Sequence, residues 1–154
     1  MGVAINQAVA GIMSGVSEIA VSTAAKVMTT GDIIFTAVGD IEAVNLYSKC
    51  ITANGVGATT VQYSVTPTVG SITSISGVSA SLASAAPGTL LTLVGDALAT
   101  APVLSASGVA LATSDRGVIV PSGTIKLVVA VGPTTGTWVH VLRYRPLEPN
   151  AYVI

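Results

Sequence analysis

The sequence Thr137-Trp-Val-His-Val-Leu-Arg-Tyr-Arg145 alternates residue by residue between two kinds of side chain. Trp138, His140, Leu142 and Tyr144 occupy every second position, and two valines and two arginines lie between and after them. Successive side chains of a β-strand point to opposite faces of the sheet. The stretch therefore predicts a long strand, which ends at the proline that follows it.

Two further long strands are predicted upstream by the same alternation. In residues 59–66, Val61, Tyr63 and Val65 face one way, and polar side chains face the other way. Residues 41–53 form the second of these strands, and an Asn–Gly turn separates the two. One predicted face of this second strand carries Val44, Leu46, Ser48 and Cys50. The other face carries Ala43, Asn45, Tyr47 and Lys49.

The rest of the chain from residue 31 onward predicts shorter strands between turns. Runs of β-branched residues alternate there with Gly, Pro, Asn and Asp. These strands are predicted at residues 32–37, 89–94, 102–107, 109–113, 117–120 and 124–131. Residues 79–85 predict one helical turn. About nine short strands with little helix are typical of all-β folds, so we predict a single-domain antiparallel β-sandwich or a jelly-roll-like barrel over residues 31–154.

The first thirty residues differ in composition from the rest of the chain. They contain no Pro and no aromatic residue and are rich in Ala, Val, Ile and Met. Val3, Val9 and Met13 do not form a continuous helical stripe. Residues 1–30 therefore predict an extended N-terminal arm, with a short helix as the alternative, and we expect this segment to pack on a partner.

Charged residues make up 8% of the chain, against about 25% in an average soluble protein. The hydrophobic fraction is 51%, and the mean hydropathy is +0.78. A chain with so few charged residues has little charged surface to present to water, so we expect part of its surface to be covered either by lipid or by other protein. A spanning helix needs about 20 mostly apolar residues, and the most apolar runs here, 125–131 and 16–25, are short. We therefore expect contact with protein and no membrane partner.

The charge distribution also argues against nucleic acid as a partner. The formal net charge is −1, and the nearest approach to a basic run is the pair Arg143 and Arg145. Nucleic-acid binding proteins present a basic patch or stripe. We expect no nucleic acid among the partners.

Few side chains could support catalysis or metal binding. One histidine, His140, and one cysteine, Cys50, cannot build a His/Cys zinc site within a chain. Asp40 and Glu42 share a strand face, and paired carboxylates could serve acid–base chemistry if His140 lay beside them in a cleft. A Cys50–His140 nucleophile pair is a further alternative. Our prediction is a protein that is not an enzyme, with no cofactor, no metal and no small-molecule substrate.

Candidate interface residues cluster at the C-terminal strand. Arg and the aromatic residues are enriched among residues that dominate binding energy at protein interfaces. The predicted interface residues are Trp138, His140, Arg143, Tyr144 and Arg145.

Several segments of the chain resemble a known family. Residues 120–127 (VPSGTIKL), 136–147 (GTWVHVLRYRPL), 151–153 (AYV), 31–41 (GDIIFTAVGDI) and 87–95 (PGTLLTLVG) are similar to small virion proteins of tailed bacteriophages. Within that group the chain resembles the capsid decoration, or cement, proteins. Residues 1–30 lie outside the resemblance.

The resemblance implies a structural role in a virion. Decoration proteins bind the outer surface of the expanded head, commonly as trimers, and clamp neighbouring subunits of the major capsid protein. It implies a homo-oligomer, with a trimer favoured over a dimer, made in the bacterial cytoplasm and located on the outer capsid surface. The alternative is another structural module of a phage: a head fibre, a tail component or an adhesin.

Overall fold

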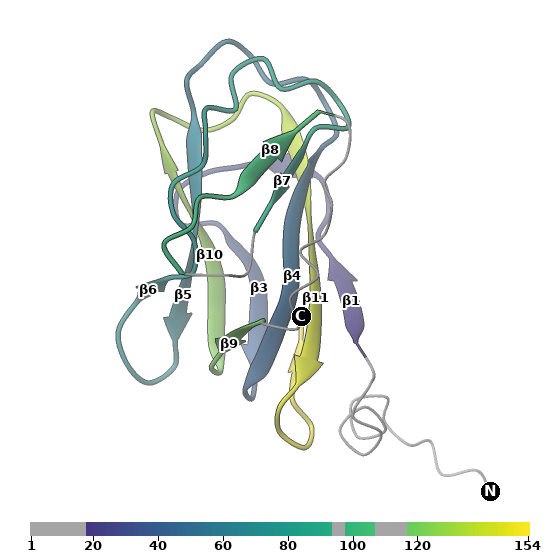
Figure 1. Ribbon diagram of the computed structural model, residues 1–154, viewed down its shortest axis with the longest axis vertical. Helices are drawn as coiled ribbons and strands as arrows, with labels where there is room; N and C mark the ends of the chain where they lie inside the picture. Colours follow the sequence, from purple (N-terminus) through teal and green to yellow (C-terminus); the bar gives the residue numbers. More distant parts are fainter. Residues whose placement is uncertain (1–17, 94–97, 107–116) are drawn as a thin grey trace, which may run out of the picture.

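Two antiparallel sheets make up the described part of the chain, residues 18–93, 98–106 and 117–154 of a computed structural model (Figure 1). The first sheet contains β1 (Ile19–Ser22), β11 (Thr137–Pro146), β4 (Ile41–Cys50), β7 (Leu90–Thr92) and β8 (Val103–Ser105), with β2 (Lys26–Val27) paired to β11 and β9 (Val118–Val120) paired to β4. The second contains β12 (Tyr152–Val153), β3 (Ile33–Val38), β10 (Gly123–Ala130), β5 (Thr60–Pro67) and β6 (Thr73–Ser74). The predicted all-β antiparallel sandwich is confirmed.

Alternation of side chains positions the core between the two sheets. Trp138, His140, Leu142 and Tyr144 of β11 are buried, and the residues that alternate with them are half-buried. In β5 the predicted inward residues are likewise buried. The core also includes Phe35 of β3 and Leu127 of β10. Burial of such side chains from both sheets supplies the main stabilisation of a sandwich.

The predicted faces of β4 are wrong in its first half because of a β-bulge. Asn45 pairs with Arg143 and Ala43 pairs with Tyr144, so Val44 is an extra residue between two register positions. An extra residue shifts the alternation by one. Ala43 is therefore buried and Val44 is half-buried, the reverse of the prediction, whereas the second half of the strand has the predicted phase.

Two other predicted elements differ from the structure. Residues 79–85 form a loop with a turn rather than a helical turn, and the described residues contain no helix. The loop exchanges backbone hydrogen bonds with its neighbours: the Ser79 N–H donates to the Val61 carbonyl, and the Leu82 N–H donates to the Thr59 carbonyl. The predicted strand at 109–113 lies outside the described residues.

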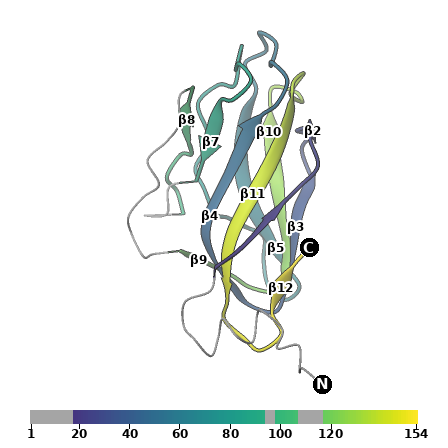
Figure 2. The same cartoon turned by 90° about the vertical axis from the view of Figure 1, so that its right-hand side faces the viewer.

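Part of the predicted N-terminal arm belongs to the sandwich. β1 and β2 both pair with β11, and Figure 2 shows β1 alongside that strand. Met28 is fully buried, and its N–H donates to the hydroxyl of Thr134 at 2.8 Å. Within the described residues the first sheet thus begins at Ile19, inside the segment that the sequence assigns to the arm. Residues 1–17 lie outside the described residues, and their packing on a partner stays a prediction.

Candidate functional site

A chain of three polar side chains crosses the core between the sheets. The Ser48 hydroxyl is 2.6 Å from the Tyr63 hydroxyl and 2.6 Å from Nδ1 of His140. All three residues have 0% exposed surface. Burial raises the pKa of the Tyr63 phenol, so that side chain is neutral at ordinary pH. The three groups hold β4, β5 and β11 in a fixed relation.

His140 is held as the neutral imidazole. Its pKa is lowered to about 4: burial is the largest cause, the Lys26 charge acts in the same direction, and the Asp32 charge acts in the opposite direction. Nε2 of His140 has no hydrogen-bond partner among the described residues. Protonation of this ring would place an uncompensated charge in the core.

The alternative of a Cys50–His140 nucleophile pair has no support in this geometry. Ser48, Cys50 and His140 are all closed off from solvent. The Cys50 thiol contacts the Thr52 carbonyl oxygen at 3.1 Å, and burial raises its pKa, which disfavours the reactive thiolate. Asp40 contacts the Ser122 N–H rather than His140.

Three of the predicted interface residues are core residues instead. Trp138, His140 and Tyr144 point inward from β11 and are almost completely buried. The Tyr144 hydroxyl accepts a hydrogen bond from the Val153 N–H, which ties β12 to the other sheet. The same period-two alternation that predicts a strand turns these side chains away from any partner, so this part of the prediction is corrected.

The remaining predicted residues, Arg143 and Arg145, lie on the outer face. Both form ion pairs with the Glu18 carboxylate, and Arg145 also pairs with Glu42 at 3.4 Å. Glu18 immediately precedes β1, so these pairs fix the start of the described chain against β11 and β4. Sequence analysis missed Glu18 because its partners are more than 120 positions away.

Charge is concentrated at one end of the sandwich. The Asp40 N–H donates to the Glu148 carboxylate at 3.0 Å, close to the turn between β3 and β4. We call the group that gathers there the charged end. It comprises Glu18, Asp40, Glu42, Arg143, Arg145 and Glu148. It lies at the lower end of the molecule in Figure 1, around the β3–β4 and β11–β12 turns.

The loops at the opposite end carry no charge, and the nearest charged side chains are the exposed Lys49 at the end of β4 and the Lys26–Asp32 ion pair beside the start of β11. No Asp, Glu, Lys or Arg occurs between Lys49 and Asp96 or between Lys126 and Arg143. These stretches supply the loops at the upper end of Figure 1: residues 51–59, 82–88 and 131–136. We call these three loops the uncharged end.

Asn54 links the loops of the uncharged end. Its side-chain carbonyl accepts hydrogen bonds from the N–H groups of Thr135 and Gly136, at 2.9 and 3.0 Å. Its amide donates to the Leu82 carbonyl at 2.8 Å. The Ser84 N–H adds a bond to the Gly55 carbonyl. One buried side chain thus holds all three loops together.

Large apolar side chains protrude from these linked loops. Val56 is 88% exposed, and Val131 is 75% exposed. Val131 also has φ = 68°, in the left-handed region that β-branched residues rarely adopt. Such a combination of strain and exposure indicates a surface used for contact rather than for folding.

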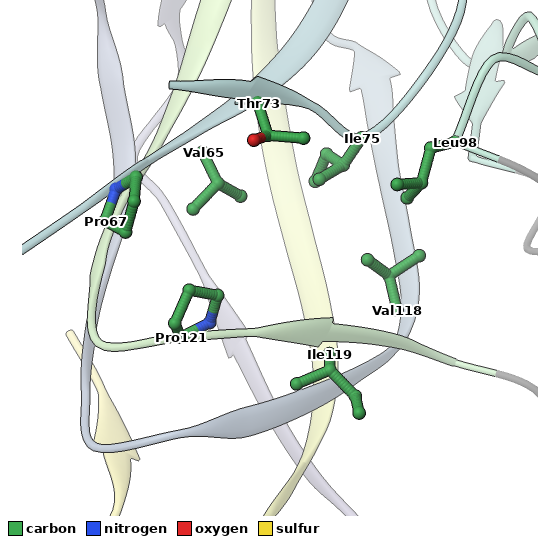
Figure 3. Close-up of a pocket in the computed structure, with 8 residues that line it drawn as sticks. All are labelled: Val65, Pro67, Thr73, Ile75, Leu98, Val118, Ile119 and Pro121. Atoms are coloured by element: carbon green, nitrogen blue, oxygen red, sulfur yellow. The ribbon is translucent and has the colours of Figure 1, made fainter. Parts of the chain in front are cut away.

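A small apolar cavity opens on the flank between the sheets (Figure 3). Its volume is about 160 Å³. Its lining consists of Val65, Pro67, Thr73, Ile75, Leu98, Val118, Ile119 and Pro121. Thr73 contributes the one polar side chain in this lining. Specific recognition of a polar substrate needs several converging polar groups, so this cavity suits an apolar group.

The described residues contain no group of three or more His, Cys, Asp or Glu side chains placed to hold a metal ion. In the same part of the chain, no helix has the length and apolar character needed to cross a membrane. No family model, curated protein or solved structure matches the chain.

Proposed function

We propose that this chain is a structural subunit that decorates the outer surface of a tailed-phage capsid as a homo-oligomer, with a trimer favoured. The observation that carries the proposal is the separation of charge between the two ends of the sandwich. An exposed surface that lacks charge over three linked loops is costly for an isolated soluble protein, because water hydrates it poorly. Burial in an assembly removes that cost.

The rigidity of the sandwich also supports a structural role. The Asn54 side chain fixes the loops at the uncharged end, and the Ser48–Tyr63–His140 chain fixes the strands beneath them. A surface that is rigid before binding loses less conformational entropy when it binds. Many copies on a symmetric shell would then each contribute a modest free energy to the assembled state.

Stabilisation of the shell follows from mass action. A protein that binds neighbouring capsid subunits only in the assembled head shifts the equilibrium toward that state. Under this proposal, the charged end and residues 1–17 are the surfaces for the major capsid protein. Arg143 and Arg145 are the candidate contacts there, because Arg recognises carboxylates through paired hydrogen bonds.

Mixing the purified protein with undecorated, expanded phage heads tests the proposal. We expect saturable co-sedimentation, and imaging of the pellet should give symmetric density on the outer shell. Absence of binding by a protein that is already a stable oligomer would instead favour the second candidate, a head-fibre, tail or adhesin module. The exposed Val56 and Val131 at the uncharged end also fit such a module, because a fibre or tail module contacts its neighbours through its ends.

A further inference from the structure

The uncharged end combines three properties that folding alone does not require. Its loops are held together by a buried side chain, Asn54, and its apolar tips at Val56 and Val131 are exposed. Its three loops carry no ionisable side chain, and the Lys26–Asp32 ion pair and Lys49 border them. We propose that this end is the surface through which copies of this chain contact one another around a symmetry axis. The inference rests on the homo-oligomeric part of the proposed function, and it is independent of the capsid.

Val131 gives the first argument for a contact surface. A left-handed backbone conformation favours Gly, Asn or Asp, and Val is among the least suited residues. The neighbouring Gly132 has φ = 106°, so the turn already uses glycine where it needs one. A valine that is both strained and exposed lowers the stability of an isolated chain. Its side chain therefore has a use outside the chain.

The absence of charge argues for a second copy as the occupant. Close to a symmetry axis, each residue meets its own copies, so any charge there would face a like charge. The charged end has four carboxylates and two guanidinium groups, a net charge of −2. Self-association through the charged end would bring like net charges together, whereas the uncharged end carries no such penalty.

A charged partner surface fits the uncharged end poorly. Carboxylates or ammonium groups buried against residues 51–59 and 131–136 would lose their hydration and gain no opposite charge. The partner surface must itself be apolar and uncharged, and this description fits the same loops of another copy. The apolar flank around Val69 and Ile119 is the competing self-contact, and the test separates the two.

Two charge insertions at matched exposure provide the test. Val131→Asp places a carboxylate at the proposed contact, and Asp tolerates the left-handed conformation better than Val, so folding should be preserved. Val69→Asp places the same group on the β5–β6 loop, where Val69 is 89% exposed. The mass of each full-length protein is measured by light scattering over a range of concentrations, together with its thermal unfolding.

We expect the wild type and Val69→Asp to share one oligomeric mass. Val131→Asp should dissociate to monomers with an apparent dissociation constant raised at least tenfold, without loss of thermal stability of the monomer. Val56→Asp should act in the same way, which guards against an effect peculiar to the Val131 turn.

Other outcomes overturn the inference. If Val69→Asp dissociated the oligomer and Val131→Asp did not, the flank would be the self-contact. If the wild type were monomeric at tens of micromolar, both this inference and the homo-oligomer would fall. Co-sedimentation of the same proteins with expanded heads is scored separately. If Val131→Asp dissociates the oligomer but the wild type does not bind heads, the inference holds and the capsid role falls. If the wild type binds heads but Val131→Asp leaves the oligomer intact, the capsid role holds and the inference falls.

Discussion

The two ends of the sandwich are held together by different kinds of interaction. At the charged end, Glu18 and Glu42 form ion pairs with Arg143 and Arg145 on the outer face. At the uncharged end, the buried Asn54 amide satisfies backbone groups of two other loops. Exposed ion pairs are weak and sensitive to salt, whereas buried amide hydrogen bonds are costly to remove. The comparison indicates a firm contact surface at one end and an adjustable, hydrated surface at the other.

Removal of the Asn54 side chain is expected to have the largest effect. Asn54→Ala leaves the buried Gly136 N–H, the partly buried Thr135 N–H and the Leu82 carbonyl without their partner, which should cost roughly 4 kcal/mol of unfolding free energy. Urea unfolding measures the change. The matched control is Asn45→Ala, since the side-chain oxygen of Asn45 has no partner among the described residues. Equal losses in the two variants would contradict the role assigned to Asn54.

Acid should weaken the centre of the sandwich through His140. Its folded-state pKa is lowered to about 4, below the ordinary value of 6.5, so between these pH values the unfolded chain binds a proton that the folded chain does not. The stabilisation is complete above pH 6.5 and is lost as the pH falls toward 4, by about 3 kcal/mol.

The difference between wild type and His140→Gln isolates this effect from the carboxylates of the charged end. Unfolding free energies of both proteins are measured from pH 7 to pH 4, and the glutamine variant should lack the additional acid-induced loss. Parallel pH profiles for the two proteins would contradict the assignment.

Glu18→Gln should have a smaller effect, confined to the charged end. The ion pairs that it removes are partly exposed, so the expected loss is about 1 kcal/mol at low salt and close to zero in 1 M salt. Thermal unfolding at the two salt concentrations measures it. Lys49→Gln is the control, because Lys49 is exposed and has no ion pair with any described residue. A loss for Glu18→Gln that is unchanged by salt would show that the ion pairs are not its cause.

The smallest effect tests the backbone strain at Val131 by its sign. Val131→Gly relieves the left-handed strain, and the flexibility of glycine in the unfolded chain offsets part of the gain, so we expect about 0.5 kcal/mol of added stability. Val128→Gly, in the regular strand β10, should destabilise. Both are measured at concentrations low enough to keep each variant monomeric. Destabilisation by Val131→Gly would remove the strain argument.

Alternation was sufficient to predict most of the fold from the sequence. The inward residues of β5 and β11 follow from period two alone, since the extra residue of the bulge lies on β4 and interrupts neither of these strands. The bulge at Val44 was not predictable, because it depends on how β4 pairs with a strand about 100 residues away. The loop at 79–85 was misassigned because its structure comes from hydrogen bonds to β5 and not from local helix propensity.

The candidate interface was predicted less well, for a physical reason. Aromatic side chains and histidine suit both a binding surface and a core, and only the direction of the strand face decides between them. β11 turns Trp138, His140 and Tyr144 inward. The uncharged end was visible in the sequence only as a run without charge from Cys50 to Gly95. The topology was needed to bring residues 131–136 beside that run.

Hydrogen exchange of the wild-type protein at two concentrations tests the central claim without any substitution. At high concentration, amide groups of residues 51–59 and 131–136 should exchange more slowly than at high dilution. Residues 39–42 and 147–150, at the charged end, should exchange at the same rate in both. Protection that rises at the charged end, or that does not depend on concentration at either end, would contradict the claim that copies of this chain meet through the uncharged end.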